Sequence, residues 1–129
     1  MPEPEGKTFE YEPESAIKPE YLEVFEFGDV EQHIKIETRE FSAVCPFSGI
    51  PDYGYLCVEY YPEGGLCIEL KSLKYYLVSF RNVGIYQEAA TSRIYADLLE
   101  KLKTGKLQVT TVYNTRGGID TTCVMGKLE

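Results

Sequence analysis

The sequence has little of what a metal site or an exported fold requires. It contains a single histidine, His33, and none of its four cysteines is paired with another at a spacing of two intervening residues. Because zinc sites usually combine closely spaced cysteines with histidines, we predict no metal site. The first five residues are acidic and rich in proline, whereas a signal peptide begins basic and turns apolar. We therefore expect a cytoplasmic protein with reduced thiols.

Two further absences limit the partners of the chain. No run of about 18 apolar residues is present, so we expect no transmembrane helix and no membrane partner. The net charge is −8, and residues 1–31 hold ten acidic residues against Lys7 and Lys18, whereas the rest of the chain is neutral. Nucleic-acid binding normally needs a basic face, so we expect no nucleic-acid partner.

A change in composition divides the chain in two. Residues 1–30 hold four of the seven prolines and most of the net charge, and we interpret them as an acidic N-terminal arm. Residues 31–129 are expected to form one domain of ordinary size. Within the arm, residues 21–27 are more apolar and are expected to dock on the body or on a neighbouring subunit. For residues 1–15 a solvated, partly disordered tail is an equal alternative.

The periodicity of apolar residues predicts four strands and two helices. In chain order these are strand 33–44, strand 55–61, helix 69–82, helix 87–103, strand 107–113 and strand 119–125. The first strand changes phase near Arg39 or Glu40, which requires a bulge. The order β-β-α-α-β-β predicts an α+β fold, an antiparallel sheet with both helices on one face.

Glycines mark the ends of the predicted elements. Gly84 and Gly105 are expected to end the two helices, and Gly117 with Gly118 supplies the positive φ that a hairpin turn needs. Four strands with two helices leave the sheet edges open, so we expect an oligomer closed by neighbouring copies. A monomer whose arm covers the edges is the alternative.

The loop from Cys45 to Asp52 is the strongest candidate for chemistry. Two prolines and a glycine make it a defined loop that holds its side chains in place. A nucleophilic cysteine has to be an accessible thiolate in a fixed position. Asp52, seven residues on, can exchange protons with the thiol or the reacting group. The alternative is a structural cysteine beside a turn aspartate.

Other charged residues have both a functional and a structural interpretation. Lys71 and Lys74, three residues apart on one helix face, can bind phosphates, or they form a solvated face. Glu88 begins the second helix, where it also favours the helix dipole, and Arg116 precedes the Gly-Gly turn. No glycine-rich dinucleotide fingerprint is present, which argues against a Rossmann cofactor site.

Together these segments resemble the NADPH-dependent 7-cyano-7-deazaguanine reductases, the nitrile reductases of queuosine biosynthesis. Residues 69–76, Glu-Leu-Lys-Ser-Leu-Lys-Tyr-Tyr, fit the signature of that family at all eight positions. Cys45-Pro46 followed by Gly49-Ile50-Pro51-Asp52 resembles its nucleophile loop. Residues 79–82 and 116–119 are similar to further family segments, so the resemblance covers about residues 33–126.

The resemblance implies a tunnelling fold that assembles into a ring-shaped homo-oligomer with active sites between subunits. It implies reduction of the nitrile of 7-cyano-7-deazaguanine, a small deazapurine, to the 7-aminomethyl product. Cys45 would add to the nitrile as a thioimide, NADPH would deliver hydride twice, and Asp52 would donate and accept protons.

The same resemblance assigns the binding residues. Glu88 would hydrogen-bond the edge of the deazaguanine, and the other substrate-binding positions would be Gln87 and Ser79. The cofactor would be held, chiefly through its phosphates, by Lys71, Lys74 and Arg116.

Three positions depart from the family pattern. Many members have a histidine at the position of Gln87 and another at that of Val83. Gln87 can hydrogen-bond a substrate but cannot titrate near neutral pH. Some members also have a second cysteine at the position of Ala90, so a protective disulfide with the nucleophile is not available here.

Two alternatives to the reductase belong to other functional classes. An archaeosine-type enzyme, which adds ammonia to the same nitrile on tRNA, would keep Cys45, Asp52 and Glu88 but would have no use for the NADPH signature. A non-catalytic protein of the same fold would only bind a purine or pterin, which the Cys-Asp pair argues against. A zinc-dependent cyclohydrolase is disfavoured by the shortage of histidine.

Overall fold

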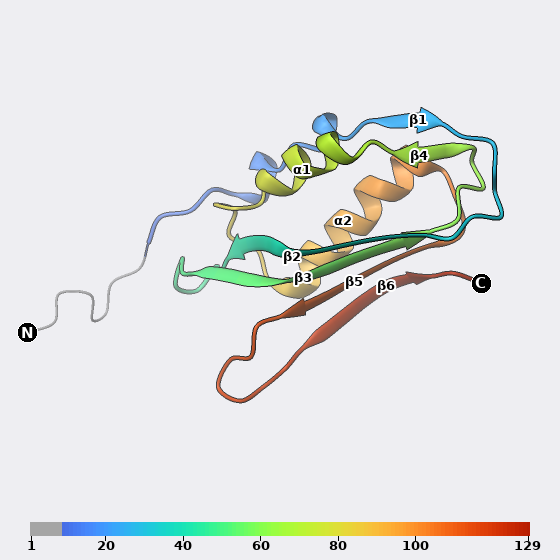
Figure 1. Cartoon of the computed structure of the whole chain (residues 1–129). Coiled ribbons are helices and arrows are strands. Elements are labelled where there is room, and N and C mark those ends of the chain that lie inside the picture. The colour runs from blue at the N-terminus through green and yellow to red at the C-terminus, as the bar shows by residue number, and fades with distance from the viewer. Residues whose placement is uncertain (1–8) are drawn as a thin grey trace, which may run out of the picture.

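A computed structural model describes residues 9–129 as an antiparallel sheet with helices on one face (Figure 1). The four strands of the sheet are, in spatial order, β2 (Ile34–Val44), β3 (Pro51–Tyr60), β5 (Leu107–Tyr113) and β6 (Thr122–Lys127). Every neighbouring pair is antiparallel. The predicted α+β class and the β-β-α-α-β-β order of these main elements are confirmed.

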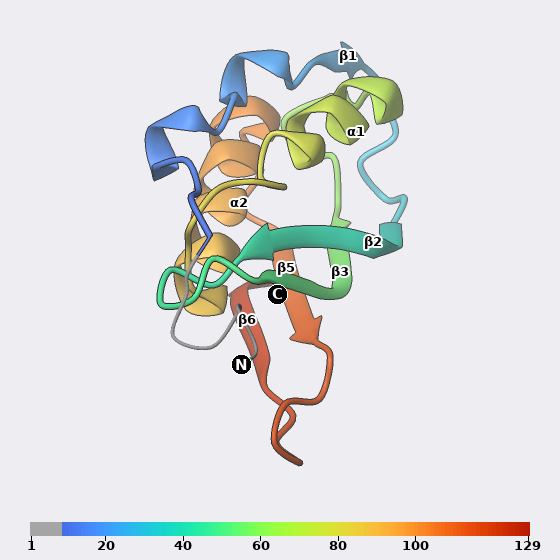
Figure 2. The ribbon, with the colours of Figure 1, turned by 90° about the vertical axis from the view of Figure 1, so that its left-hand side faces the viewer.

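Helices α1 (Leu70–Val78) and α2 (Gln87–Leu102) cover the same face of the sheet, as Figures 1 and 2 show. Four α2 residues at helical spacing are fully buried, as expected for a helix predicted from the periodicity of its apolar residues: Ala90, Ile94, Leu98 and Leu102. They belong to one core with alternate residues of the strands, including Leu56, Val58, Leu107 and Val109. Each large apolar side chain buried there contributes about 1.5–3 kcal/mol to folding.

The first helix is shorter than predicted. α1 ends at Val78 instead of Asn82, because the backbone beyond it forms tighter turns in which the amide of Val83 donates to the carbonyl of Phe80 at 3.0 Å. The carbonyl of Val83 then accepts from the amide of Val44, at the end of β2, also at 3.0 Å. The chain therefore leaves the helix to join the sheet, a contact that helical periodicity does not reveal.

Neither of the two glycines predicted to end the helices lies at a helix end. Gly84 lies beyond α1, where its amide donates to the carbonyl of Glu12 at 2.9 Å. Helix α2 ends at Leu102, and its C-cap is Lys103, which takes the left-handed conformation with φ of +54°, so Gly105 is not the cap. The next residue, Thr104, is tied to the sheet because its hydroxyl donates to the carbonyl of Tyr61 at 2.8 Å.

Two local predictions are confirmed. The register between β2 and β3 shifts between Thr38 and Phe41, where the bulge was expected. Gly117 and Gly118, in the β5–β6 hairpin, have φ values of +58° and +78°. A Cβ atom is disfavoured at such φ values, which is why glycine occupies both positions.

A second, two-stranded sheet was not predicted. β1 (Val24–Glu26) pairs antiparallel with β4 (Leu66–Ile68), and strands of three residues carry too little alternation to be recognised in a sequence. Two short 3-10 turns, Glu14–Ala16 and Pro19–Tyr21, precede β1.

The described part of the N-terminal segment packs on the rest of the molecule. Ile17 and Leu22 are only 3% and 2% exposed and belong to the core. The amide of Phe9 donates to the carbonyl of Ser48 at 3.1 Å. The alternative prediction, a solvated tail, concerns residues 1–15, and residues 1–8 of that range lie outside the described residues. Within residues 9–129, no helix combines the length and apolar character that crossing a membrane requires.

Candidate active site

A cleft of about 290 Å³ lies where the end of β2, the start of β3 and the first turn of α2 approach the β5–β6 hairpin. This hairpin extends beyond the rest of the sheet (Figure 2). Five of the predicted site residues line the cleft: Cys45, Asp52, Gln87, Glu88 and Arg116. Folding therefore gathers residues from three separate parts of the sequence around one space.

Cys45 directly follows β2 on a tight loop. Its amide donates to the carbonyl of Ile50 at 2.9 Å, and its carbonyl accepts from the amide of Gly49 at 2.7 Å. Partial burial opposes ionisation of the thiol, but hydrogen bonds from the backbone of Ser48 and Phe47 and from the Ser48 side chain outweigh it, so the pKa of Cys45 is lowered. The thiolate is the nucleophilic form of cysteine, and the loop favours it.

Asp52 is the second residue of β3 and not, as predicted, the end of a loop. β3 begins at Pro51, and Asp52 pairs with Ala43 of β2. In the sequence Pro51 indicates a loop, but the first residue of a strand also tolerates proline. The connection between the two strands is therefore residues 45–50, which places the thiol and the carboxylate at the two ends of one hairpin.

The carboxylate of Asp52 is buried against Arg116. Asp52 is 8% exposed, and its Oδ1 lies 2.7 Å from Nη1 of Arg116. Burial raises the pKa of the Asp52 carboxyl, and the charge of Arg116 acts in the opposite direction. The sequence suggested Arg116 only as a cofactor ligand, so this ion pair is an additional contact that the fold creates. The arginine side chain remains 53% exposed.

Gln87 and Glu88 form the first turn of α2 and have different environments. Gln87 is buried, and its Nε2 donates to the carbonyl and hydroxyl oxygens of Thr111, both at 3.1 Å, and to the carbonyl of Thr121 at 2.9 Å. Its amide hydrogens are thus engaged within the protein, and they fasten α2 to the hairpin. Glu88 is exposed at the helix N-terminus, where the helix dipole favours a carboxylate.

Five residues that line the cleft were not predicted as site residues: Tyr86, Tyr113, Asn114, Ile119 and Thr121. Among them, Tyr113 is 6% exposed, and its hydroxyl has no hydrogen-bond partner among the described residues. In the sequence Tyr113 is the last inward-facing residue of an alternating strand, so nothing distinguishes it from a core residue. Only the fold shows that it borders the cleft.

The other three predicted site residues do not line the cleft. Lys71 and Lys74 are exposed on α1, where Nζ of Lys71 lies 5.8 Å from the ring centroid of Tyr75. Ser79 is the C-cap of α1, and its hydroxyl accepts from the amide of Lys18 at 3.0 Å. Ser79 therefore fastens the N-terminal segment to α1.

Two residues of the signature over 69–76 support the helix. The carboxylate of Glu69 caps the N-terminus of α1, accepting from the amides of Ser72 at 2.8 Å and Lys71 at 3.1 Å. These bonds lower the pKa of Glu69. The hydroxyl of Ser72 accepts from the amide of Glu23 at 2.9 Å, which links the helix to the N-terminal segment. The signature thus combines helix-capping residues with exposed lysines.

Comparison with known proteins identifies the family. The family model described as QueF-like protein matches residues 51–129. A protein of Thermotoga petrophila named NADPH-dependent 7-cyano-7-deazaguanine reductase is 60% identical over 129 residues, which is 100% of this chain and 94% of the relative. The chain belongs to the QueF-like family. The family predicted from the sequence motifs is thus confirmed.

Further relatives of this QueF-like chain agree in name. A protein of Thermotoga maritima with the same name is also 60% identical over 129 residues, and one of Chloroherpeton thalassium is 44% identical over 108 residues, 82% of this chain and 92% of the relative. Among solved structures, the apo crystal structure of the archaeosine synthase QueF-Like has a TM-score of 0.68 at 22% identity, covering 75% of this chain and 94% of that one. This likeness shows a shared fold.

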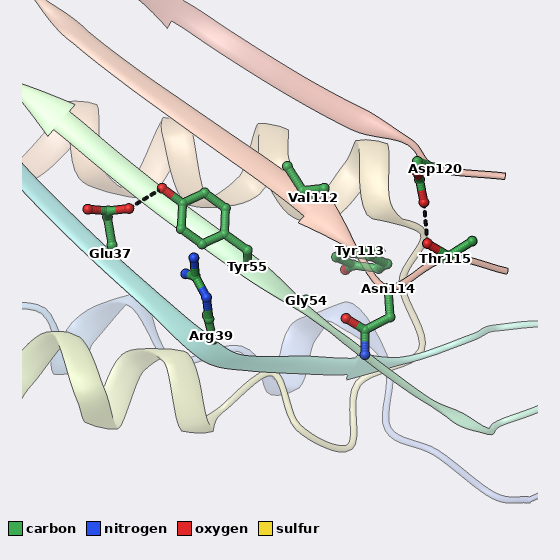
Figure 3. Close-up of a pocket in the computed structure, with 9 residues that line it drawn as sticks. All are labelled: Glu37, Arg39, Gly54, Tyr55, Val112, Tyr113, Asn114, Thr115 and Asp120. Atoms are coloured by element: carbon green, nitrogen blue, oxygen red, sulfur yellow. Dashed lines mark hydrogen bonds between the residues drawn. The ribbon is translucent and has the colours of Figure 1, made fainter. Parts of the chain in front are cut away.

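The QueF-like chain has a second hollow of about 500 Å³ over the face of the sheet that points away from the helices (Figure 3). There the hydroxyl of Tyr55 donates to Glu37 at 2.6 Å, and the guanidinium of Arg39 lies 5.0 Å from the Tyr55 ring centroid. None of the predicted site residues lines it. Across residues 9–129, no three histidine, cysteine, aspartate or glutamate side chains gather as a metal site.

Proposed function

We propose that this chain reduces the nitrile of 7-cyano-7-deazaguanine to the 7-aminomethyl group with NADPH, a step of queuosine biosynthesis. The observation that carries the proposal is the cleft in which the Cys45 thiol, with its lowered pKa, and the buried carboxylate of Asp52 lie together. The names of the relatives, which agree over the full chain at 60% identity, support the same reaction and the same cofactor.

The chemistry of the two residues follows from their environments. Cys45 would attack the nitrile carbon as a thiolate, so that a sulfur–carbon bond forms and an electron pair passes to the nitrile nitrogen. Asp52, ionised beside Arg116, would accept the proton of the thiol and pass it to that nitrogen, which yields a neutral thioimide. A positioned acid or base of this kind typically contributes about 10²–10⁴-fold to a rate.

We propose that Glu88 recognises the substrate by hydrogen bonding. Its exposed carboxylate borders the cleft at the start of α2 and can accept hydrogen bonds from the N–H groups of a deazaguanine. Gln87 has its amide hydrogens engaged with Thr111 and Thr121, so we propose that it orients α2 and offers the substrate at most its oxygen. Ser79, which borders α1, would reach a substrate only across an interface between subunits.

The residues that would hold the cofactor are Lys71, Lys74 and Arg116. When bound, NADPH supplies hydride to the nitrile carbon. The side chains fit this role because two ammonium groups and an exposed tyrosine ring lie on one open helix face, a set suited to phosphates and a planar base. Arg116 keeps half of its side chain exposed beside the cleft.

The separation of α1 from the cleft supports a homo-oligomer with active sites between subunits. Neither lysine lines the cleft within one chain, so a neighbouring copy would have to bring its α1 to the cleft. The outer surface of α1 exposes Leu70, Tyr75 and Val78, and β2 and β6 are the outer strands of the main sheet. We propose that these surfaces join copies into the ring of a tunnelling fold.

Two other predictions extend the proposal. We propose that residues 1–30 act as an arm to the catalytic domain of residues 31–129, with its apolar part docked as β1. We also propose a cytoplasmic location, in keeping with the four free thiols of the described chain.

The test is to mix the purified full chain with 7-cyano-7-deazaguanine and NADPH. We expect the nicotinamide absorbance to fall and the product to gain four hydrogens by mass spectrometry. An archaeosine-type enzyme would instead form the thioimide without oxidising NADPH and would require ammonia and modified tRNA. That second outcome would overturn the reductase. The neutral balance of charge outside residues 1–31 argues against a tRNA substrate.

A further inference from the structure

The Tyr113 hydroxyl is a buried polar group that the fold leaves without a hydrogen bond. Tyr113 ends β5, is 6% exposed and lines both the cleft and the hollow of Figure 3, yet its hydroxyl has no partner among the described residues. Buried tyrosine hydroxyls usually find a partner, and an unsatisfied one destabilises a fold. Such a group beside a binding cleft points to a partner that arrives with the ligand.

The sheet places this tyrosine beside Asp52. Tyr113 pairs with Gly54 across β5 and β3, and Asp52 precedes Gly54 by two residues, so both face the helices. A Cβ at Gly54 would lie 2.7 Å from Cδ1 of Tyr113, so the absence of a side chain there lets the ring lie across the strand. Figure 3 shows Gly54 and Tyr113 side by side on these two strands.

Its surroundings make the hydroxyl a donor. Burial raises the pKa of Tyr113, and the nearby charges of Asp52 and Glu88 act in the same direction, against an opposing effect of Arg116. The group therefore keeps its proton at neutral pH and seeks an acceptor. Gln87, the neighbouring amide, has its own N–H groups engaged with Thr111 and Thr121 and does not compete for that acceptor.

We propose that the Tyr113 hydroxyl donates a hydrogen bond to the substrate nitrogen that becomes negatively charged as Cys45 adds to the nitrile. This inference rests on the proposed function. As the sulfur–carbon bond forms, one carbon–nitrogen π bond breaks and its electron pair passes to the nitrogen. The proton released by the thiol ends on that nitrogen through Asp52, while Tyr113 keeps its own. Donors placed where charge develops lower a barrier most effectively in a water-poor site.

The test compares Tyr113→Phe with the wild type in thioimide formation, followed by rapid quench and intact mass at saturating 7-cyano-7-deazaguanine without NADPH. Phenylalanine keeps the ring on Gly54 and removes only the hydroxyl. We expect the variant to form the adduct at least about tenfold more slowly, since removing one donor to a developing charge slows catalysis by up to about 10³-fold. Its thermal unfolding midpoint should be no lower than that of the wild type, because the hydroxyl has no partner to lose.

Tyr76→Phe is the matched control. Tyr76 is fully buried, and its hydroxyl donates to Oδ2 of Asp97 at 2.6 Å, so this variant should unfold at a lower temperature and form the adduct at the wild-type rate. If Tyr113→Phe reacts as fast as the wild type, or loses stability as Tyr76→Phe does, the role of Tyr113 is overturned. If the wild type itself forms no adduct, the proposed function fails, and this inference fails with it.

Discussion

The cleft and the outer surface of α1 differ in how fully a single chain encloses them. In the cleft, Asp52 is nearly buried and ion-paired, and Cys45 is fixed by backbone hydrogen bonds. On α1, by contrast, three side chains are exposed, and none of them lines the cleft: Lys71, Lys74 and Tyr75. Covalent chemistry needs fixed geometry, which one fold can supply, whereas a long charged cofactor needs a broad surface. Under the proposed function, the cleft is the catalytic half of the site and the surface of α1 is the cofactor-binding half.

The largest effect is expected at Cys45, the proposed nucleophile of the cleft. Cys45→Ala should abolish both the thioimide and NADPH oxidation, because Cys45 is the only cysteine among the described residues that line the cleft, and its pKa is lowered. Intact mass with substrate alone checks this. Cys123→Ala is the control, since burial raises the pKa of that thiol, and it should form the adduct normally. An adduct on the Cys45→Ala variant would contradict the covalent mechanism at Cys45.

A smaller but still large loss is expected at the acid of the cleft. Asp52→Asn should slow thioimide formation by about 10²–10⁴-fold, the usual contribution of a general acid or base, while far-ultraviolet circular dichroism shows an intact fold. The amide keeps the shape of the carboxylate but cannot exchange a proton. A loss of less than about threefold would make Asp52 a structural residue of β3.

The α1 surface should respond differently from the cleft. Lys71→Ala with Lys74→Ala should raise the KM for NADPH by about tenfold or more, since charge-assisted hydrogen bonds contribute about 1.5–3 kcal/mol each and exposed ones less. The rate of thioimide formation should stay at the wild-type value, because that step uses no cofactor. Adding salt should shrink the difference between variant and wild type in KM.

A charge-matched control sharpens this result. Lys101→Ala with Lys106→Ala removes two positive charges outside both regions and should leave the KM for NADPH unchanged. If the α1 double variant instead slows thioimide formation as much as it weakens NADPH binding, the division into two halves is wrong.

The smallest effect concerns Arg116, which links the two halves. Arg116 lowers the pKa of Asp52, so Arg116→Gln should raise that pKa further. If the ionised carboxylate is the reactive form, the rate of thioimide formation will begin to fall at a higher pH as the solution is acidified. Arg116→Lys keeps the charge and should keep the wild-type profile. Identical profiles for all three proteins would contradict a role for the ion pair.

The same variant has a consequence for stability. An aspartate whose pKa is raised in the folded state favours folding below its unfolded pKa, and this contribution is lost as the pH rises through the folded pKa. Arg116→Gln should therefore be less stable than the wild type at neutral pH and should approach it in acid. Thermal unfolding at several pH values measures the difference.

The sequence by itself determined the elements that rest on local rules. The stripe of Ala90, Ile94, Leu98 and Leu102 follows from the helical repeat, and the bulge after Thr38 follows from a change of phase in a strand. The Gly117-Gly118 turn follows from the conformational freedom of glycine. The motif over residues 69–76 and the loop from Cys45 to Asp52 also identified the family, and that resemblance assigned five residues of the cleft: Cys45, Asp52, Gln87, Glu88 and Arg116.

Only the tertiary structure decided which groups meet. The pairing of β1 with β4 and the early end of α1 depend on partners far away in the chain. The same is true of the ion pair between Asp52 and Arg116, and of the Tyr113 hydroxyl, which is buried without a partner among the described residues. Periodicity reports which side of an element is buried. A pKa or an unsatisfied hydrogen bond depends on the distances between side chains, and folding alone sets those distances.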